Sequence, residues 1–338
     1  MVKLQDRTIF GLRGDACVAI VLVLGPLIYL GFRLGADSRR QSRRMDGTKL
    51  RVRGDSMSPT LTDGQECVLK PIEDFATLRR GDLVAVTADG GLRVKRLAAL
   101  PGDIVDAVDG RVTINGTRLE TLLRARVSDY IAPALIPVDN QFSSWSRVVG
   151  FPDWLIYHHR DPHRGGRPGP VVDDYPGNVM VSRKLHPVDR LIVRFSRLRV
   201  DGTPPSNKSY RVAFHRTATE SIQVAQASHE AGGYLVADSA EATVFAEHSL
   251  ALGSHLDASR PVAIEDFAEV DSANIELLRE IEYRDDRPGL DYPLTLDVDT
   301  FFVLGDNVPI SVDSRATGPI RRNQIVGEIT SPSFQDRP

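Results

Sequence analysis

Residues 82–116, DLVAVTADGGLRVKRLAALPGDIVDAVDGRVTING, decide the fold of this 338-residue chain. Short apolar runs alternate with Gly, Pro and Asp, which is typical of β-strands joined by tight turns and not of helices. Asp109-Gly110 and Asn115-Gly116 are dipeptides that favour two-residue hairpin turns. The predicted strands are 82–88, 92–99, 103–108 and 111–115. The stretch therefore predicts a compact antiparallel sheet.

The same pattern of short apolar runs broken by Gly, Pro and Asp is present before this stretch and again far beyond it. We expect the late strands to return to the first sheet, because they resume its pattern after a long interval. Flanking strands are predicted at 49–54, 66–70, 299–307 and 323–331. The long interval itself holds apolar runs at 191–200, 209–216, 220–227, 242–250 and 274–283. Regular short strands of this kind predict a second, inserted β-sandwich, and a mainly β protein overall.

The N-terminal region contains one long apolar run with basic residues on both sides of it. Residues 1–53 hold 11 Lys/Arg against 4 Asp/Glu, a net +7 in a chain whose total is −3. Ala16 to Phe32 is a run of 17 uncharged residues, from which we predict one transmembrane helix over about 16–34. A cleaved signal peptide fits less well, because the run exceeds the usual 7 to 15 apolar residues. Arginines after the span favour, by charge bias alone, a cytoplasmic body.

Composition excludes several other classes. The chain is 41% hydrophobic and 26% charged, with 27 Gly and 21 Pro, which excludes collagen-like and disordered proteins. Cys17 and Cys67 are too few for a disulfide framework. There is no Gly-rich phosphate loop, and the basic stretch 39–53 has no interleaved aromatic residues. We therefore expect neither a cofactor nor a nucleic-acid partner, and about two domains.

Three short segments carry candidate chemistry. GDSMSPTL (54–61) places Ser56 in a Gly-containing turn, where a hydroxyl can be presented. A serine nucleophile needs a base, but residues 1–157 contain no histidine. In LRVKRLAALPGD (92–103), Lys95 stands between apolar residues, and a buried lysine whose pKa falls can act as that base. GDNVPISVDSR (305–315) is dense in short polar side chains that could orient such a dyad.

Together and in this order, the three segments closely resemble the boxes of bacterial type I signal peptidases, which are membrane-anchored Ser–Lys proteases. The resemblance implies that Ser56 is the nucleophile, that Lys95 is the general base, and that the Ser56 N–H donates to the oxyanion. It also implies that Ser311 orients Lys95, and that Asp313 and Arg315 form a supporting ion pair. The chain departs from the family at Gly54, where some members have a hydroxyl, and at 308–310, where Val-Pro-Ile replaces polar residues.

The resemblance also implies a substrate and a location. It places five apolar residues in shallow pockets for small side chains at positions −1 and −3 of the cleavage site, although plain core positions are the alternative. These residues are Leu50, Val52, Met57, Leu61 and Val94. The implied partners are precursor proteins bearing signal peptides and the lipid bilayer of the bacterial inner membrane. The implied placement of the catalytic body is the exported side, against the charge bias.

The predicted division of the chain is discontinuous. Residues 1–48 form the anchor segment, 49–118 and 295–338 form the catalytic domain, and 119–294 form the inserted domain, which by texture is concanavalin- or laminin-G-like. Within the insert, His158, His159 and His163 lie close together in sequence. Their spacing is not that of a zinc protease, so we expect no metal site.

Two readings from other classes stay open. A self-cleaving Ser–Lys repressor-type protease uses a similar dyad, but it normally follows a DNA-binding domain and has no membrane anchor. An inactive, membrane-anchored binding protein would use its insert to bind a glycan or a protein, but Ser56 and Lys95 are both intact.

Overall fold

The computed structural model describes eleven stretches of the chain, and the predicted membrane span at 16–34 lies outside them. No helix within these stretches is long and apolar enough to cross a bilayer. The described residues are 47–126, 131–148, 151–175, 177–178, 181–196, 210–216, 221–229, 234–244, 255–265, 275–286 and 289–330.

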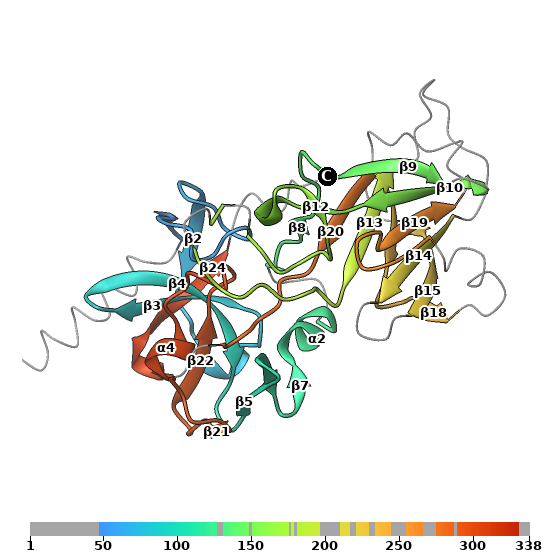
Figure 1. The fold of residues 1–338 in the computed structure, drawn as a ribbon. Coiled ribbons are helices and arrows are strands. Elements are labelled where there is room, and N and C mark those ends of the chain that lie inside the picture. Colours follow the sequence, from blue (N-terminus) through green and yellow to red (C-terminus); the bar gives the residue numbers. More distant parts are fainter. Residues whose placement is uncertain are drawn as a thin grey trace, which may run out of the picture.

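The first domain is built on a seven-stranded sheet that joins the two ends of the described chain (Figure 1). Its strands, in spatial order, are β1 (Thr48–Arg51), β2 (Glu66–Lys70), β24 (Ile325–Thr330), β3 (Leu83–Ala88), β4 (Gly91–Ala99), β22 (Thr300–Leu304) and β23 (Ile320–Arg321). All of their pairings are antiparallel. The expected return of the late strands to the first sheet is therefore confirmed.

β24 lies between β2 and β3 because its sequence permits a very close approach. Its burial alternates along the strand, so one face packs into the core. A Cβ atom on Gly327 would stand 2.5 Å from the Lys70 carbonyl oxygen and 2.7 Å from Leu69 Cδ1. Only glycine allows β24 to pack this closely against β2.

A smaller sheet extends the first domain, and its turns are those that the sequence predicts. Its strands are β21 (Leu294–Thr295), β5 (Ile104–Val108), β6 (Arg111–Ile114) and β7 (Thr117–Arg118). Asp109 and Asn115 both have φ of 52°, and Gly110 and Gly116 have φ of 72° and 78°. Two successive residues with positive φ form the turn that matches the twist of a hairpin.

The segment predicted to be inserted, residues 119–294 and called the insert below, contributes two larger sheets. The six-stranded sheet runs β18 (Thr243–Val244), β15 (Ser221–Gln226), β14 (Arg211–Arg216), β19 (Val262–Glu265), β10 (Phe151–His158) and β9 (Ser144–Val148). The five-stranded sheet runs β16 (Ser228–His229), β17 (Tyr234–Asp238), β13 (Leu191–Ser196), β20 (Ile275–Arg279) and β8 (Ile136–Pro137). Both sheets supply side chains to one hydrophobic core, in which Phe195 and Tyr210 meet edge to face at 5.5 Å. The likeness to concanavalin or laminin G stays a prediction.

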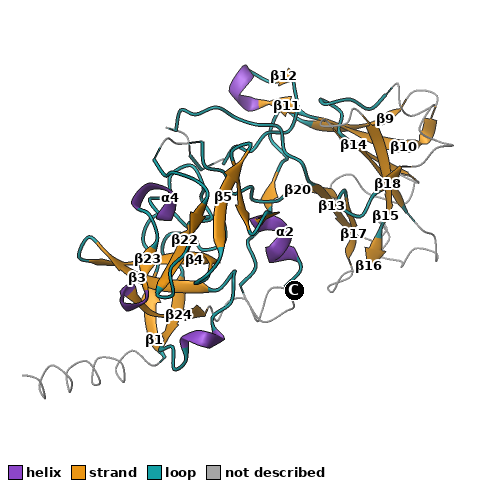
Figure 2. Ribbon diagram, turned by 90° about the horizontal axis from the view of Figure 1, so that it is seen from below, coloured by secondary structure: helices purple, strands orange, loops and turns teal. Residues whose placement is uncertain are grey.

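The helical segments among the described residues are short and lie at connections. They are α2 (Leu119–Arg124), α4 (Ser314–Thr317) and the 3₁₀ turns Phe75–Thr77, Pro162–Arg164 and Arg322–Gln324. Separately, β11 (Arg160–Asp161) and β12 (Arg167–Pro168) pair as a two-stranded ribbon. α2 lies between the two groups of sheets (Figure 2). Its Leu119 and Leu123 share a core with Ile281 and Tyr283 and with strands of the first domain. The predicted boundaries near 118 and 294 thus fall within a common core, and the division into domains stays a prediction.

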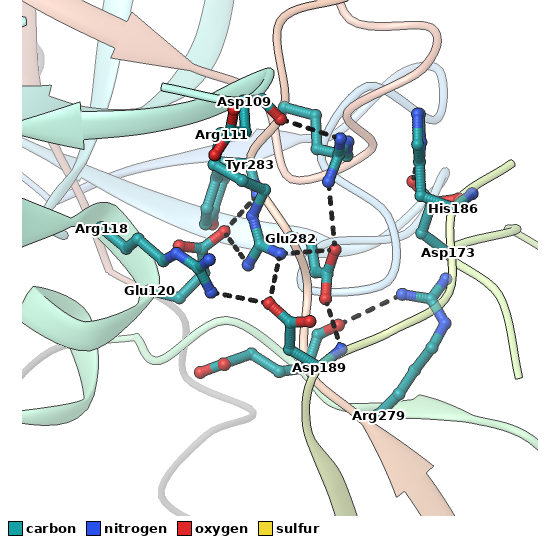
Figure 3. A network of polar contacts seen from close by, with 12 residues as sticks. Asp109, Arg111, Arg118, Glu120, Asp173, His186, Asp189, Arg279, Glu282 and Tyr283 are labelled. Carbon is teal, nitrogen blue, oxygen red and sulfur yellow. Dashed lines mark hydrogen bonds and ion pairs between the residues drawn. The ribbon is translucent and has the colours of Figure 1, made fainter. Parts of the chain in front are cut away.

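A buried ionic network joins the first domain to the insert (Figure 3). The Arg111 guanidinium contacts Glu120 at 3.1 Å, Asp189 at 3.1 Å and Glu282 at 2.8 Å. Glu120 also accepts the backbone N–H of Tyr283 at 2.7 Å. Burial raises the pKa of Glu282 to about 7, and the charge of Arg111 opposes that rise. The Arg111 guanidinium therefore forms ion pairs with three carboxylates at this junction.

We expect Arg111→Met to lower the free energy of unfolding by about 3 to 5 kcal/mol, because it leaves buried carboxylates without their cation. Arg118→Met is the matched control, since Arg118 is half exposed and pairs with Asp189 at the rim, and its loss should cost less than about 1 kcal/mol. Chemical denaturation of both variants measures the difference. Equal losses would show that the Arg111 network does not hold the junction.

Candidate active site

Lys95 is buried in the middle of β4, and strand register brings it to residues 305–315, which are called the closing segment below. β4 pairs with β22 so that Arg96 stands opposite Leu304, the last residue of β22. Lys95 is 3% exposed, and its Nζ donates to Ser311 Oγ at 2.8 Å. Burial lowers the pKa of Lys95 to about 8, although the nearby charge of Asp313 acts in the opposite direction. A lysine in this setting can lose its proton near neutral pH.

Ser56 lies in a turn that packs against the same closing segment. Its carbonyl oxygen accepts the backbone N–H of Asn307 at 3.1 Å. A Cβ atom on Gly305 would stand 2.5 Å from that carbonyl oxygen and would overlap the Ser311 hydroxyl. The main chain of Ser56 and the hydroxyl that Lys95 contacts therefore flank one glycine, which leaves room for both.

Asp313 and Arg315 form the ion pair that the resemblance implies. Their Oδ2 and Nη2 atoms are 2.7 Å apart, and both side chains are buried. The Asp313 carboxylate also accepts the Gly305 N–H at 2.9 Å. Burial pushes the pKa of Asp313 upward, but hydrogen bonds and charge from Arg315 outweigh it, so the pKa lies below its usual value. Ser314 accepts the Val303 N–H at 3.0 Å and so ties the same turn to β22.

A second buried ion pair was missed by sequence reasoning. Arg96 Nε donates to Asp306 Oδ1 at 2.8 Å, and Arg96 Nη2 donates to Oδ2 at 2.5 Å, with both side chains fully buried. Thr60 donates to the same carboxylate, and Tyr283 Oη donates to it at 2.7 Å. The available signal was a second charged residue beside Lys95 in an apolar strand, together with the aspartate of the closing segment.

Two further contacts reach the closing segment from the insert. Tyr175 Oη donates to the Asp306 carbonyl oxygen at 2.8 Å. Asn178 Nδ2 donates to Asn307 Oδ1 at 2.7 Å, and Asn307 Nδ2 donates back to Asn178 Oδ1 at 3.0 Å. Neither Tyr175 nor Asn178 stands in a motif, so no sequence pattern marked them.

The five apolar residues assigned to substrate pockets lie together. All of them belong to one hydrophobic cluster, in which Met57 and Leu61 are fully buried and Leu50 and Val94 are partly exposed. Val52 is 8% exposed. The structure thus brings the five residues to one place, and their role in substrate binding stays a prediction.

The histidines of the insert have separate partners. His158 Nε2 lies 2.7 Å from Ser146 Oγ, His159 Nδ1 lies 3.4 Å from Tyr157 Oη, and His163 Nε2 lies 2.9 Å from Asp174. Across the part of the chain that the structure describes, no three His, Cys, Asp or Glu side chains gather as metal ligands would.

The three motif segments whose contacts are described above lie within a match to a known protein family. The family model of signal peptidases, peptidase S26, matches residues 43–151 and 187–334, which is most of the chain. The chain belongs to the signal peptidase family. All three motif segments fall inside the matched ranges.

Curated proteins similar to this chain include signal peptidases of Bacillus species. It is 41% identical over 71 residues to signal peptidase I of Bacillus licheniformis, which is 20% of this chain and 38% of that protein. It is 32% identical over 106 residues to signal peptidase I of Bacillus amyloliquefaciens, which is 27% of this chain and 56% of that protein. Signal peptidase I T of Bacillus subtilis is 38% identical over 71 residues, 20% of this chain and 37% of that protein. The matched part of the chain thus covers about half or less of the length of each of these relatives.

The family model passes over one segment of this chain. Residues 152–186 lie between the two matched ranges, and this segment contains Tyr175 and Asn178. The contacts that these two residues make to Asp306 and Asn307 are therefore formed from outside the matched family sequence.

We expect Gly305→Ala to lower the free energy of unfolding by about 1 to 3 kcal/mol, because its Cβ would overlap Ser311 and crowd the Ser56 carbonyl. Gly91→Ala is the control, since the nearest atom to its Cβ is the Ala88 carbonyl oxygen at 3.8 Å. Thermal unfolding of the two variants compares them. A Gly305→Ala protein as stable as wild type would contradict the tight packing described here.

Proposed function

We propose that this protein is a membrane-anchored serine endopeptidase that cleaves signal peptides from exported precursor proteins. The observation that carries the proposal is Lys95, a buried amine with a pKa of about 8 that is hydrogen-bonded to Ser311 beside the main chain of Ser56. Family membership supports the same reaction class.

In the proposed mechanism, neutral Lys95 removes the proton of the Ser56 hydroxyl, and Ser56 Oγ attacks the scissile carbonyl. Lys95 then protonates the leaving amine, which releases the mature protein and leaves an acyl-enzyme. A water molecule then gives a proton to Lys95 and attacks the ester, and Lys95 returns the proton to Ser56 Oγ as the signal peptide leaves with a free carboxylate. Gly54 offers no hydroxyl to the oxyanion, so the Ser56 N–H is the donor that we propose.

The surroundings of Lys95 suit a neutral amine. Ser311 presents a hydroxyl to Nζ and not a carboxylate, so it orients the amine without strongly favouring the charged form. Asp313 is the nearby acid, and Arg315 neutralises it through a two-point contact. The ion pair thus holds the turn while limiting the pull of Asp313 on the Lys95 proton.

The proposed substrate has small residues at −1 and −3. Leu50, Val52, Met57, Leu61 and Val94 are proposed to shape the two pockets, because they form one apolar cluster beside the Ser56 turn. An extended peptide would bind by adding a strand, with alternate side chains entering the pockets.

The proposed location is the bacterial cytoplasmic membrane, with one span at about 16–34 and the catalytic domain on the exported side. Precursor proteins and the lipid bilayer are the proposed partners. A body of this size can translocate despite flanking positive charge, so the arginines after the span do not exclude this orientation.

We expect Ser56→Ala and Lys95→Ala each to abolish cleavage of a precursor that has an Ala-x-Ala site, because each removes one member of the dyad. Lys70→Ala is the control, since Lys70 is an exposed lysine on β2. Cleavage is followed by gel shift of the precursor, and a covalent acyl-enzyme trapped at Ser56 supplies independent proof. Activity retained in either dyad variant would overturn the mechanism.

The rate should rise with pH. Because Lys95 must be neutral to accept a proton and its pKa is about 8, kcat/KM should increase through an acid limb near pH 8. Asp313 raises the pKa of Lys95, so Asp313→Asn should move that limb to lower pH. A pH–rate profile that is flat between about pH 7 and 9 would argue against Lys95 as the base.

Protease added to intact spheroplasts tests the proposed orientation. We expect the catalytic domain to be digested, because it would face outward from the cytoplasmic membrane. A fully protected domain would mean that the charge bias, and not the family, sets the topology.

A further inference from the structure

A single turn of the insert reaches the closing segment of the catalytic domain. The Asn178 N–H donates to the Tyr175 carbonyl oxygen at 2.8 Å, which closes a turn over residues 175–178. The Tyr175 ring lies against the Arg279 guanidinium at 5.2 Å, and Arg279 is itself 1% exposed. β20, which carries Arg279, thereby anchors the turn to the core of the insert.

The turn holds two successive residues of the closing segment in different ways. Tyr175 donates to the backbone carbonyl of Asp306, so this contact fixes the main chain. Asn178 and Asn307 exchange two side-chain hydrogen bonds, so this contact fixes an amide. Asp306 and Asn307 are 0% and 2% exposed, and water cannot readily replace these partners.

Asn307 is hydrogen-bonded to Ser56 and to Ser311, which in turn contacts Lys95, so it links the two members of the proposed dyad. Its backbone N–H donates to the Ser56 carbonyl oxygen at 3.1 Å. Its carbonyl oxygen accepts the Ser311 N–H at 3.0 Å, and Ser311 Oγ accepts the Lys95 amine at 2.8 Å. A shift of Asn307 would therefore change the separation of the serine and the lysine.

We propose that Tyr175 and Asn178 are positioning residues that set the Ser56–Lys95 geometry by clamping Asp306 and Asn307, so that the insert completes the catalytic site. This inference rests on the proposed function. Both residues lie in the segment 152–186 that the family model passes over, so the clamp is formed by residues outside the matched family sequence.

The clamp adds hydrogen bonds and no charge. This matters because a nearby carboxylate or guanidinium would change the pKa of Lys95 directly, whereas the phenol and the amide act on it only through position. Their removal should therefore reduce turnover and leave nearly unchanged the binding of the peptide, which is proposed to use the apolar cluster and not Tyr175 or Asn178.

The test uses the full chain purified in detergent and an internally quenched peptide with Ala at −1 and −3. Asn178→Leu keeps the branched shape and the number of heavy atoms of the side chain but removes both side-chain hydrogen bonds to Asn307, and it should lower kcat about tenfold with KM within about twofold. Tyr175→Phe removes one bond and should lower kcat about threefold. Asn178→Leu combined with Asn307→Leu should lose little more than Asn178→Leu alone, because the two side chains act as one pair.

Tyr157→Phe is the matched control, because Tyr157 is also a buried phenol of the insert and its hydroxyl contacts His159 instead of the closing segment. It should leave kcat at the wild-type value. A loss of kcat in Tyr157→Phe equal to that in Asn178→Leu would mean that any weakening of the insert has this effect, and the clamp would be rejected.

A second readout does not depend on cleavage. Acetic anhydride labelling of Lys95 across pH reports its titration midpoint, which should rise in Asn178→Leu because a looser closing segment exposes the amine to water. Wild-type protein that leaves the peptide uncut, with a midpoint that still moves in Asn178→Leu, would reject the proposed function and keep the clamp. An unchanged midpoint together with wild-type kcat in Asn178→Leu would overturn the clamp itself.

Discussion

The buried ion pair between Arg96 and Asp306 is the constraint on which the rest of the site depends. Neither side chain has any exposed surface, so each charge can be tolerated only while the other is in place. The remaining atoms of the pair are also satisfied, since Arg96 donates to the carbonyls of Gly81 and Ile131 at 2.7 Å and Asp306 accepts from Thr60 and Tyr283. The serine turn, the lysine strand, the closing segment and the insert therefore meet at one carboxylate, and none can shift alone.

Two neighbouring residues of β4 show how the choice of partner decides what burial does to a base. Arg96 and Lys95 are equally removed from water, but Arg96 faces a carboxylate and Lys95 faces a hydroxyl. The first arrangement preserves a permanent charge that serves structure. The second compensates the desolvation of the amine only in part, so burial lowers its pKa to about 8 against the opposing charge of Asp313 and makes proton transfer possible. Strand alternation separates the two environments, because adjacent side chains point to opposite faces.

Features that depend on local sequence were predictable, and so was the return of the late strands to the first sheet, but individual side-chain contacts outside the recognised segments were not. The strand at 66–70 and the turns at Asp109-Gly110 and Asn115-Gly116 follow from residue type and order alone. Ser311 and Asp313 were singled out because they stand in a recognisable segment; Ser311 accepts the Lys95 amine and Asp313 pairs with Arg315, while their catalytic roles stay predictions. Arg96 and Asp306 are 210 residues apart, and Asn178 and Asn307 are 129 apart, so no periodicity links them. Such pairs become visible only when register and packing are known. The membrane span and the substrate pockets stay predictions.

The place of β24 between β2 and β3 has a consequence for how the protein is made. Thr87 on β3 contacts the residue just before β24, Gln324, across 237 positions of sequence. While the chain is being synthesised, the edges of β2 and β3 that pair with β24 stay open until all of residues 119–294 and then β24 itself have left the ribosome. An insert that folds early around its own core would shorten the effective distance between these strands and lower the entropic cost of closing the sheet. The inserted domain would then assist the folding of the sheet that surrounds it in sequence, and the proposed nucleophile and base would be joined last.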